Sequence, residues 1–157
     1  MKPDQARVLR CLAAPPERVF GAFATAKMVG RWLSPSAEVP LTVLRYEFCE
    51  GGTYRFMYEL PDGRTMKVNG IFRSIAAPAL IAFSWNIEPP DEHAGLQSEV
   101  TVNITPTAGG TELLIRHEQL SLGGSAARHA LGWSGAADRL MVLLEGNPLE
   151  SQEQGPC

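Results

Sequence analysis

The part of the chain that most restricts its fold runs from Leu41 to Gln119, where short segments of alternating apolar and polar residues are separated by turn residues. Alternation with period two is typical of half-buried β-strands. Turns such as Pro61–Gly63 join segments of this kind into hairpins. The predicted strands are 41–48, 53–60, 64–75, 79–87, 98–105 and 111–119, and a seventh candidate precedes them at 6–14.

Helical patterns flank this region on both sides. Residues 16–24 and 26–32 are predicted as short helices, and Pro16 and Glu17 suit the first turn of the first one. A single long pattern follows at 126–145, where a rise of 1.5 Å per residue gives a helix of about 30 Å. Its predicted inner face carries His129, Trp133, Ala137, Leu140 and Leu144.

These elements together predict the fold class. Consecutive hairpins make an antiparallel sheet, and one face of such a sheet must be covered. Only the helix at 126–145 is long enough to cover it. We therefore expect an α+β fold: a curved, antiparallel seven-stranded sheet around a long C-terminal helix, with two short helices after the first strand. The expected domain spans residues 1–147, and residues 148–157 are expected to form a flexible tail.

Composition narrows the class of protein. A chain of 157 residues that is 45% hydrophobic and 20% charged is expected to form one globular domain. Its net charge of -3, without a basic stripe, argues against nucleic acid and membrane partners. No signal peptide or membrane span is visible. Cys11, Cys49 and Cys157 form no CxxC pair, so we expect free thiols, no metal site and a cytoplasmic location.

Glycines interrupt two of the predicted elements. Gly132 and Gly135 stand inside the long helix, where each costs roughly 1 kcal/mol relative to alanine. Because a small residue lets a helix approach another backbone closely, we expect at least one of them to lie against the sheet or a short helix. Gly70, inside the strand at 64–75, is expected to mark a bulge or a close backbone approach.

Several motifs, in their order along the chain, resemble those of a known family. They are APPERVFGAF, GRW, YEFCEGGTYRF, PDGRTMKVNGIFRSI, GGTELLIRHEQL and HALGWSGAADRL. The chain resembles the START-like (Bet v 1-like) helix-grip superfamily and, within it, the single-domain proteins named after the C-terminal domain of the activator of Hsp90 ATPase. The resemblance implies the helix-grip fold and, for some members of the superfamily, cyclase-like or hydrolytic activity.

Aromatic residues and two histidines are the candidate lining of a cavity between sheet and helix. His117 follows Leu113 and Ile115 at even spacing and so shares their strand face, and His129 lies one helical turn before Trp133. Each histidine is either a packed residue with a hydrogen bond or a polar group that orients a ligand. The candidate cavity residues are Trp32, Tyr54, Phe56, Tyr58, Phe72, Phe83, Trp85, His117, His129 and Trp133.

The sequence contains no recognisable catalytic set. It has no GxSxG nucleophile elbow, its paired glycines lie in hairpins, and Cys49 has acidic neighbours that disfavour a thiolate. We therefore expect a binding domain for a small hydrophobic or aromatic ligand, with no cofactor. Two alternatives stay open: a cyclase-like or hydrolytic enzyme that uses His117 and His129, and a protein-interaction or Hsp90-type co-chaperone module. A homodimer and a chaperone partner are both compatible with the sequence.

Overall fold

The computed structural model describes residues 4–91, 93–121 and 123–145. Along the chain its elements are β1 (Ala6–Leu12), α1 (Pro16–Gly21), α2 (Ala26–Trp32), β2 (Leu41–Tyr46), β3 (Thr53–Glu59), β4 (Thr65–Ala76), β5 (Leu80–Ile87), β6 (Gln97–Thr107), β7 (Gly110–Glu118) and α3 (Ser125–Glu145). The order of a strand, two short helices, six strands and a long helix is the one that the sequence predicts. The predicted fold class is confirmed.

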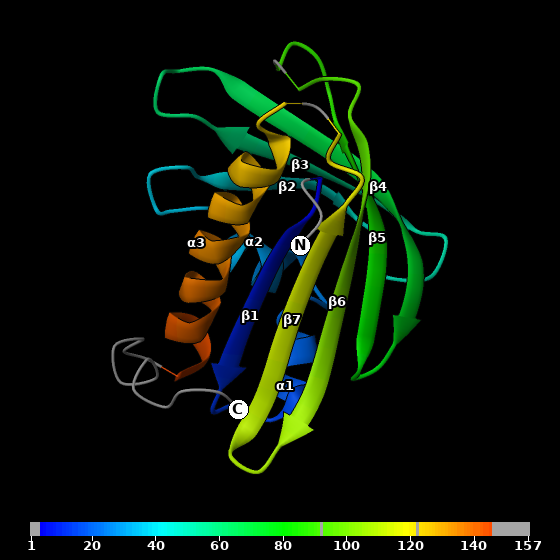
Figure 1. The fold of residues 1–157 in the computed structure, drawn as a ribbon, viewed down its shortest axis with the longest axis vertical. Helices are drawn as coiled ribbons and strands as arrows, with labels where there is room; N and C mark the ends of the chain where they lie inside the picture. The colour runs from blue at the N-terminus through cyan, green and yellow to red at the C-terminus, as the bar shows by residue number, and fades with distance from the viewer. Residues whose placement is uncertain (1–3, 92, 122, 146–157) are drawn as a thin grey trace.

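The strands form one antiparallel seven-stranded sheet in the order β1-β7-β6-β5-β4-β3-β2. From β2 to β7 each strand pairs with the next one in sequence. The first strand, β1, pairs with the last, β7, and Val8 lies opposite Ile115. In Figure 1, strands β1, β7 and β6 run roughly between the top and the bottom of the view. Strands β2 and β3 run across the view, behind α3. Strand twist accumulates over the sheet and makes its inner face concave.

Helix α3 lies next to β1 and covers the concave face there (Figure 1). Arg10 on β1 joins the two elements, because its Nε donates to Asp138 Oδ1 (3.1 Å) and its Nη2 donates to Ser134 Oγ (2.8 Å). The buried residues of the helix are Ser125, His129, Trp133, Ala136, Ala137, Leu140 and Met141. They include four of the five residues of the predicted inner face, and Leu144 is half-buried.

Aromatic rings on β3, β4 and β5 fill the middle of the concave face. The Tyr54 ring lies 4.7 Å from that of Phe56 and 5.7 Å from that of Phe83, measured between centroids. Gly70 makes room for Tyr54, since a Cβ there would lie 2.6 Å from the Tyr54 ring and against the Ser84 carbonyl oxygen. Tyr54 Oη donates a 2.6 Å hydrogen bond to that carbonyl. The close approach expected at Gly70 is confirmed.

The two short helices close the other part of the core. Trp32, at the end of α2, is fully buried and donates from Nε1 to the Ala22 carbonyl oxygen across 2.9 Å. Its ring meets the edge of Phe23 at 4.9 Å between centroids. The first helix ends at Gly21 rather than at residue 24, because residues 22–25 turn the chain toward α2, where Thr25 accepts from the Met28 amide (3.2 Å).

The two glycines of α3 have different surroundings. A Cβ at Gly135 would lie 2.8 Å from the carbonyl carbon of Pro35 and would collide with its oxygen. A close backbone approach therefore occurs at Gly135, but its partner is the loop at 33–39 that follows α2 and not the expected sheet or short helix. At Gly132 a Cβ would meet no atom within 4 Å, so this glycine makes no close approach to another element.

The thiols differ from the sequence-based expectation. Cys49 is exposed and free, but Cys11 is disulfide-bonded, so the prediction of free thiols is wrong for Cys11. The expected tail at 148–157 lies outside the described residues. None of the described helices combines the length and apolarity needed to cross a membrane.

Candidate functional site

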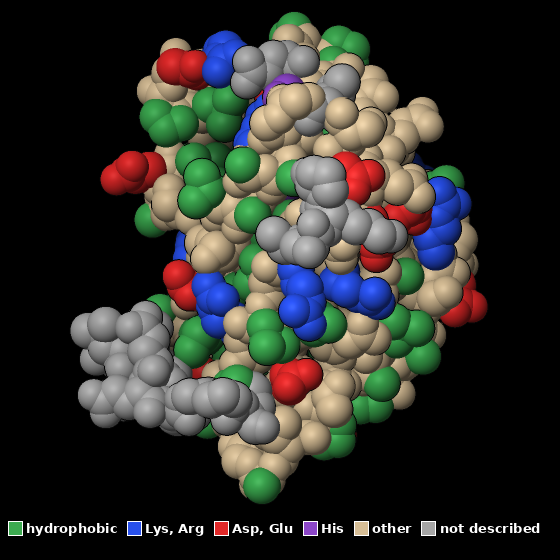
Figure 2. All heavy atoms as spheres, viewed as in Figure 1, with side chains coloured by type: hydrophobic (Ala, Val, Ile, Leu, Met, Phe, Trp, Pro, Cys, Tyr) green, Lys and Arg blue, Asp and Glu red, His purple; other side chains and the backbone are tan. Residues whose placement is uncertain are grey.

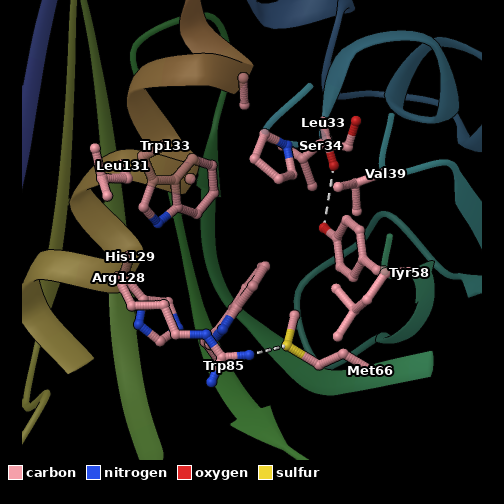
Figure 3. Close-up of a pocket in the computed structure, with 14 residues that line it drawn as sticks. Leu33, Ser34, Val39, Tyr58, Met66, Trp85, Arg128, His129, Leu131 and Trp133 are labelled. Atoms are coloured by element: carbon pink, nitrogen blue, oxygen red, sulfur yellow. Dashed lines mark hydrogen bonds between the residues drawn. The ribbon is translucent and has the colours of Figure 1, made fainter. Parts of the chain in front are cut away.

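A pocket of about 230 Å³ lies between the first half of α3, the loop at 33–39 and strands β3 to β5. Figure 3 shows Trp133 and Tyr58 on opposite sides of it, with Trp85 and Met66 on the side formed by the sheet. The lining residues are Leu33, Ser34, Pro35, Val39, Tyr58, Leu60, Met66, Trp85, Arg128, His129, Leu131, Gly132, Trp133 and Ala136. Most of this surface is aliphatic or aromatic, which is typical of small-molecule sites.

Gly132 leaves the α3 wall of the pocket open. A Cβ at this position would have no neighbour within 4 Å, and Gly132 is one of the lining residues, so no packed atom fills the wall here. Next to it, Leu131 is 77% exposed and marks the mouth together with the exposed Pro35. Figure 2 shows hydrophobic side chains gathered over this part of α3 and the adjoining β3–β4 hairpin. The pocket therefore opens through an apolar rim.

Protein groups already satisfy the polar atoms on the loop side. Tyr58 Oη donates to the Leu33 carbonyl oxygen (3.0 Å), and burial raises the pKa of this hydroxyl, which stays protonated. Ser34 Oγ donates to the Ser36 carbonyl oxygen (3.1 Å) and accepts from Arg139 on α3. These bonds fasten the loop at 33–39 to both β3 and α3.

Arg128 and Asp91 form a polar edge. Two guanidinium nitrogens of Arg128 each donate to a different carboxylate oxygen of Asp91, both at 2.8 Å, and one also lies 2.8 Å from Met66 Sδ. The hydrogen bonds from Arg128 lower the pKa of the buried Asp91 carboxyl. Nearby, His93 Nδ1 lies 2.7 Å from Ser125 Oγ. Together these contacts fasten the β5–β6 connection to the first turns of α3.

His117 is the centre of a closed hydrogen-bond chain behind the pocket wall. Trp133 Nε1 donates to His117 Nδ1 (2.9 Å), and an indole N–H can only donate, so Nδ1 carries no proton. His117 Nε2 therefore donates to Ser98 Oγ (2.7 Å), and the Ser98 hydroxyl donates to the Trp85 carbonyl oxygen (2.9 Å). Burial, with a smaller contribution from His129, holds the pKa of His117 well below its ordinary value. The ring is neutral and both of its nitrogens are occupied.

His129 lines the pocket and keeps one nitrogen available. Its Nδ1 lies 2.8 Å from the Ser125 carbonyl oxygen and must carry the proton, because a carbonyl only accepts. Burial lowers the pKa of His129; the Ser125 hydrogen bond opposes this effect, and the charges of Arg128 and His93 reinforce it. The ring is thus neutral at pH 7 with an unprotonated Nε2. Within the described part of the chain, Nε2 has no hydrogen-bond partner.

Trp85 carries a second unsatisfied group beside His129. Its indole ring is 5% exposed and lies 5.5 Å from the Trp133 ring and 6.2 Å from the His129 ring, measured between centroids. The Nε1–H of Trp85 is buried and meets no hydrogen-bond acceptor among the described residues. An indole N–H in this situation costs free energy until an acceptor reaches it.

Four of the ten candidate cavity residues lie on the pocket wall: Tyr58, Trp85, His129 and Trp133. The structure places the other six elsewhere. His117 lies behind Trp133, and Trp32 is in the core beneath α1 and α2. Only about 10 Å³ of space is lined by Tyr54, Phe56, Phe72 and Phe83. Tyr54 and Phe72 each meet Phe83 edge to face, and Phe56 packs at a tilt against Tyr54, so the rings leave no room for a ligand.

Sequence reasoning missed most of the aliphatic wall. Leu33, Ser34, Pro35 and Val39 come from a loop whose path has no periodic signal. The other lining residues that were missed are Leu60, Met66, Arg128, Leu131, Gly132 and Ala136. Among these residues only Gly132 has a usable sequence signal, because a glycine inside a helix costs stability and marks a position where the absence of a side chain matters.

The site offers limited chemistry of its own. His117 has both ring nitrogens occupied and is absent from the wall, so the two histidines do not form an acid–base pair facing one ligand. Among the described residues, no three His, Cys, Asp or Glu side chains gather as a metal ion requires. What the pocket presents is apolar surface and one imidazole acceptor, and an unmet indole donor is buried in the adjacent Trp85 ring.

Comparison with known proteins identifies the family. Residues 13–145, which are most of the chain, match the family described as activator of Hsp90 ATPase homolog 1-like protein. The chain belongs to this family. No curated protein matches it. The resemblance inferred from the sequence motifs is therefore confirmed at the level of the family.

Solved structures of bacterial proteins share the fold of this family member. A protein of Chromobacterium violaceum aligns with a TM-score of 0.81 at 24% identity, over 93% of this chain and 100% of its own. The AHSA1 protein of Silicibacter pomeroyi aligns with a TM-score of 0.77 at 24% identity, over 93% of this chain and 99% of its own. A protein of Arthrobacter aurescens gives 0.79 at 20% identity, over 92% and 87%. At these identities the likeness concerns the fold alone.

Proposed function

We propose that this protein binds a compact, largely apolar small molecule in the pocket beside Trp133. The observation that carries the proposal is the opening at Gly132: α3 carries a helix-weakening residue whose missing side chain leaves space in the pocket and contacts nothing. The apolar rim at Leu131 and Pro35 supports entry of an apolar compound. Burial of such a compound contributes roughly 25 cal/mol per Å² of apolar surface.

The test uses the tryptophans as reporters. Trp85 and Trp133 line the pocket, whereas Trp32 is fully buried in the core. Titration with a library of small aromatic compounds is expected to change tryptophan fluorescence at micromolar to millimolar concentrations. Trp133→Phe is expected to remove much of the change while circular dichroism shows a folded protein.

A blocking variant tests the location. Gly132→Val places a branched side chain in the open space and is expected to weaken binding at least tenfold. Val142→Ala, at an exposed position of the same helix, is the matched control and leaves binding unchanged. If no compound perturbs the wild type, or if Gly132→Val binds as the wild type does, the ligand-binding proposal fails. The apolar rim would then favour the protein-interaction alternative.

A further inference from the structure

We infer that the pocket selects a neutral ligand with a hydroxyl group, whose O–H donates to Nε2 of His129 and whose oxygen lies beside Nε1–H of Trp85. The inference rests on the proposed function and deepens it, since it names the chemistry of the ligand. Two observations carry it: an acceptor without a donor on His129, and a donor without an acceptor on Trp85.

The hydrogen bond to Ser125 fixes the role of His129. Because Nδ1–H is held by the Ser125 carbonyl oxygen, Nε2 is the nitrogen left for a ligand, and it can only accept in the neutral ring. A hydroxyl or another N–H or O–H group supplies the missing proton. Ethers, esters and hydrocarbons of the same shape do not.

Charge around the site argues against an anionic ligand. The cation on the pocket wall, Arg128, already gives two hydrogen bonds of 2.8 Å to the Asp91 carboxylate, which balances its charge. A carboxylate ligand brings no proton for Nε2 and would bring a second negative charge next to Asp91. Taking an anion into an apolar pocket without a free counter-ion is costly.

The indole N–H of Trp85 explains why a hydroxyl fits better than another donor. A hydroxyl oxygen both donates and accepts, so one group can meet His129 and Trp85 together. The two rings are adjacent, with centroids 6.2 Å apart. Since the Trp85 N–H is buried, the inferred contact requires the surrounding side chains to move so that the ligand oxygen can reach it.

Matched compounds separate the donor from the rest of the ligand. We would measure binding of 2-naphthol, 2-methoxynaphthalene and 2-naphthoate to the whole chain at pH 7.5 by titration calorimetry. The alcohol is expected to bind about five- to tenfold more tightly than the ether, which corresponds to one net hydrogen bond. The carboxylate is expected to bind most weakly. In NMR spectra, 2-naphthol and not the ether is expected to shift the Trp85 indole N–H signal.

Variants of His129 test the assignment. His129→Phe keeps a ring and removes the acceptor, so the alcohol and the ether are expected to bind it equally. His129→Gln, which restores an acceptor, is expected to recover part of the preference, and Val142→Ala is the control. Equal binding of alcohol and ether to the wild type overturns this inference while leaving the proposed function standing, and this comparison needs no variant. If none of the three compounds binds, the proposed function fails for compact bicyclic compounds, and the inference fails with it.

Discussion

The indole nitrogen of Trp133 donates a 2.9 Å hydrogen bond to Nδ1 of His117 and so joins the pocket wall on α3 to strand β7 of the sheet. This bond determines the tautomer of His117. The chain of hydrogen bonds continues from His117 to Ser98 and ends at the backbone carbonyl of Trp85 on β5. The chain of bonds holds Trp133 in one orientation. A histidine that sequence reasoning offered as a ligand-contacting residue is therefore a positioning residue for the ring that lines the pocket.

His117→Phe is expected to destabilise the protein by about 1–3 kcal/mol. The substitution keeps a buried ring but leaves the Trp133 N–H without an acceptor, and an unsatisfied buried donor costs this much. Urea unfolding would measure the change. In a double-mutant cycle with Trp133→Phe, a coupling near zero would show that the hydrogen bond contributes nothing.

Acid is expected to weaken the fold as the pH falls below about 6.5. The pKa values of His117 and His129 are lowered in the folded state from an ordinary value of 6.5, so below that pH the unfolded chain binds more protons. The stabilisation is complete above about pH 6.5 and falls as the pH drops toward the folded-state values, by at most about 1.4 kcal/mol per pH unit for each histidine.

Urea titrations between about pH 5 and pH 7.5 would measure this slope. The lowered pKa values of Asp91 and Glu88 make contributions that are lost only below their ordinary values of 3.8 and 4.5, outside this window. His117→Phe and His129→Phe are each expected to flatten the curve. A wild-type stability that is constant across the window would contradict the assignment of neutral histidines.

The fold followed from the sequence because its signals are local. Alternation fixes which side chains of β3 to β7 face the core, and the spacing of His129, Trp133, Ala137 and Leu140 fixes the inner face of α3. The pocket did not follow, because its position depends on how tightly rings pack. Tyr54, Phe56, Phe72 and Phe83 have the residue types of a cavity lining, but they interlock. No pattern in a single sequence distinguishes rings that meet each other from rings that face open space.

The pair formed by Asp91 and Arg128 is expected to matter more than other ion pairs of the chain. The Asp91 side chain is 3% exposed and that of Arg128 is 29% exposed, so solvent screens the pair only in part. Asp91→Asn is expected to destabilise the fold by about 1–3 kcal/mol, because a buried bidentate partner becomes neutral. It is also expected to speed hydrogen exchange in the β5–β6 connection. Glu99→Gln is the control: its partner Arg73 is 53% exposed, and a loss below about 1 kcal/mol is expected. Equal losses in the two variants would refute a special role of Asp91.

Alanine at the two glycines of α3 is expected to have opposite effects on stability. Gly132→Ala gains helix propensity and meets no atom, so the free energy of unfolding rises by about 0.5–1 kcal/mol. Gly135→Ala gains the same propensity but drives its methyl group into the Pro35 carbonyl, so it is expected to lose about 1–3 kcal/mol.

Chemical denaturation of the two variants side by side would measure this difference, with the shared gain in propensity acting as an internal control. Only Gly132→Ala narrows the pocket, so it combines a more stable fold with weaker binding of an aromatic ligand. That combination distinguishes a role in ligand binding from a role in packing. If a residue is small because of packing, enlarging it lowers the stability of the protein. If it is small because of a ligand, enlarging it lowers only the affinity for that ligand. A Gly132→Ala protein that is destabilised as much as Gly135→Ala would place residue 132 in a packed interface and close the pocket as a binding site.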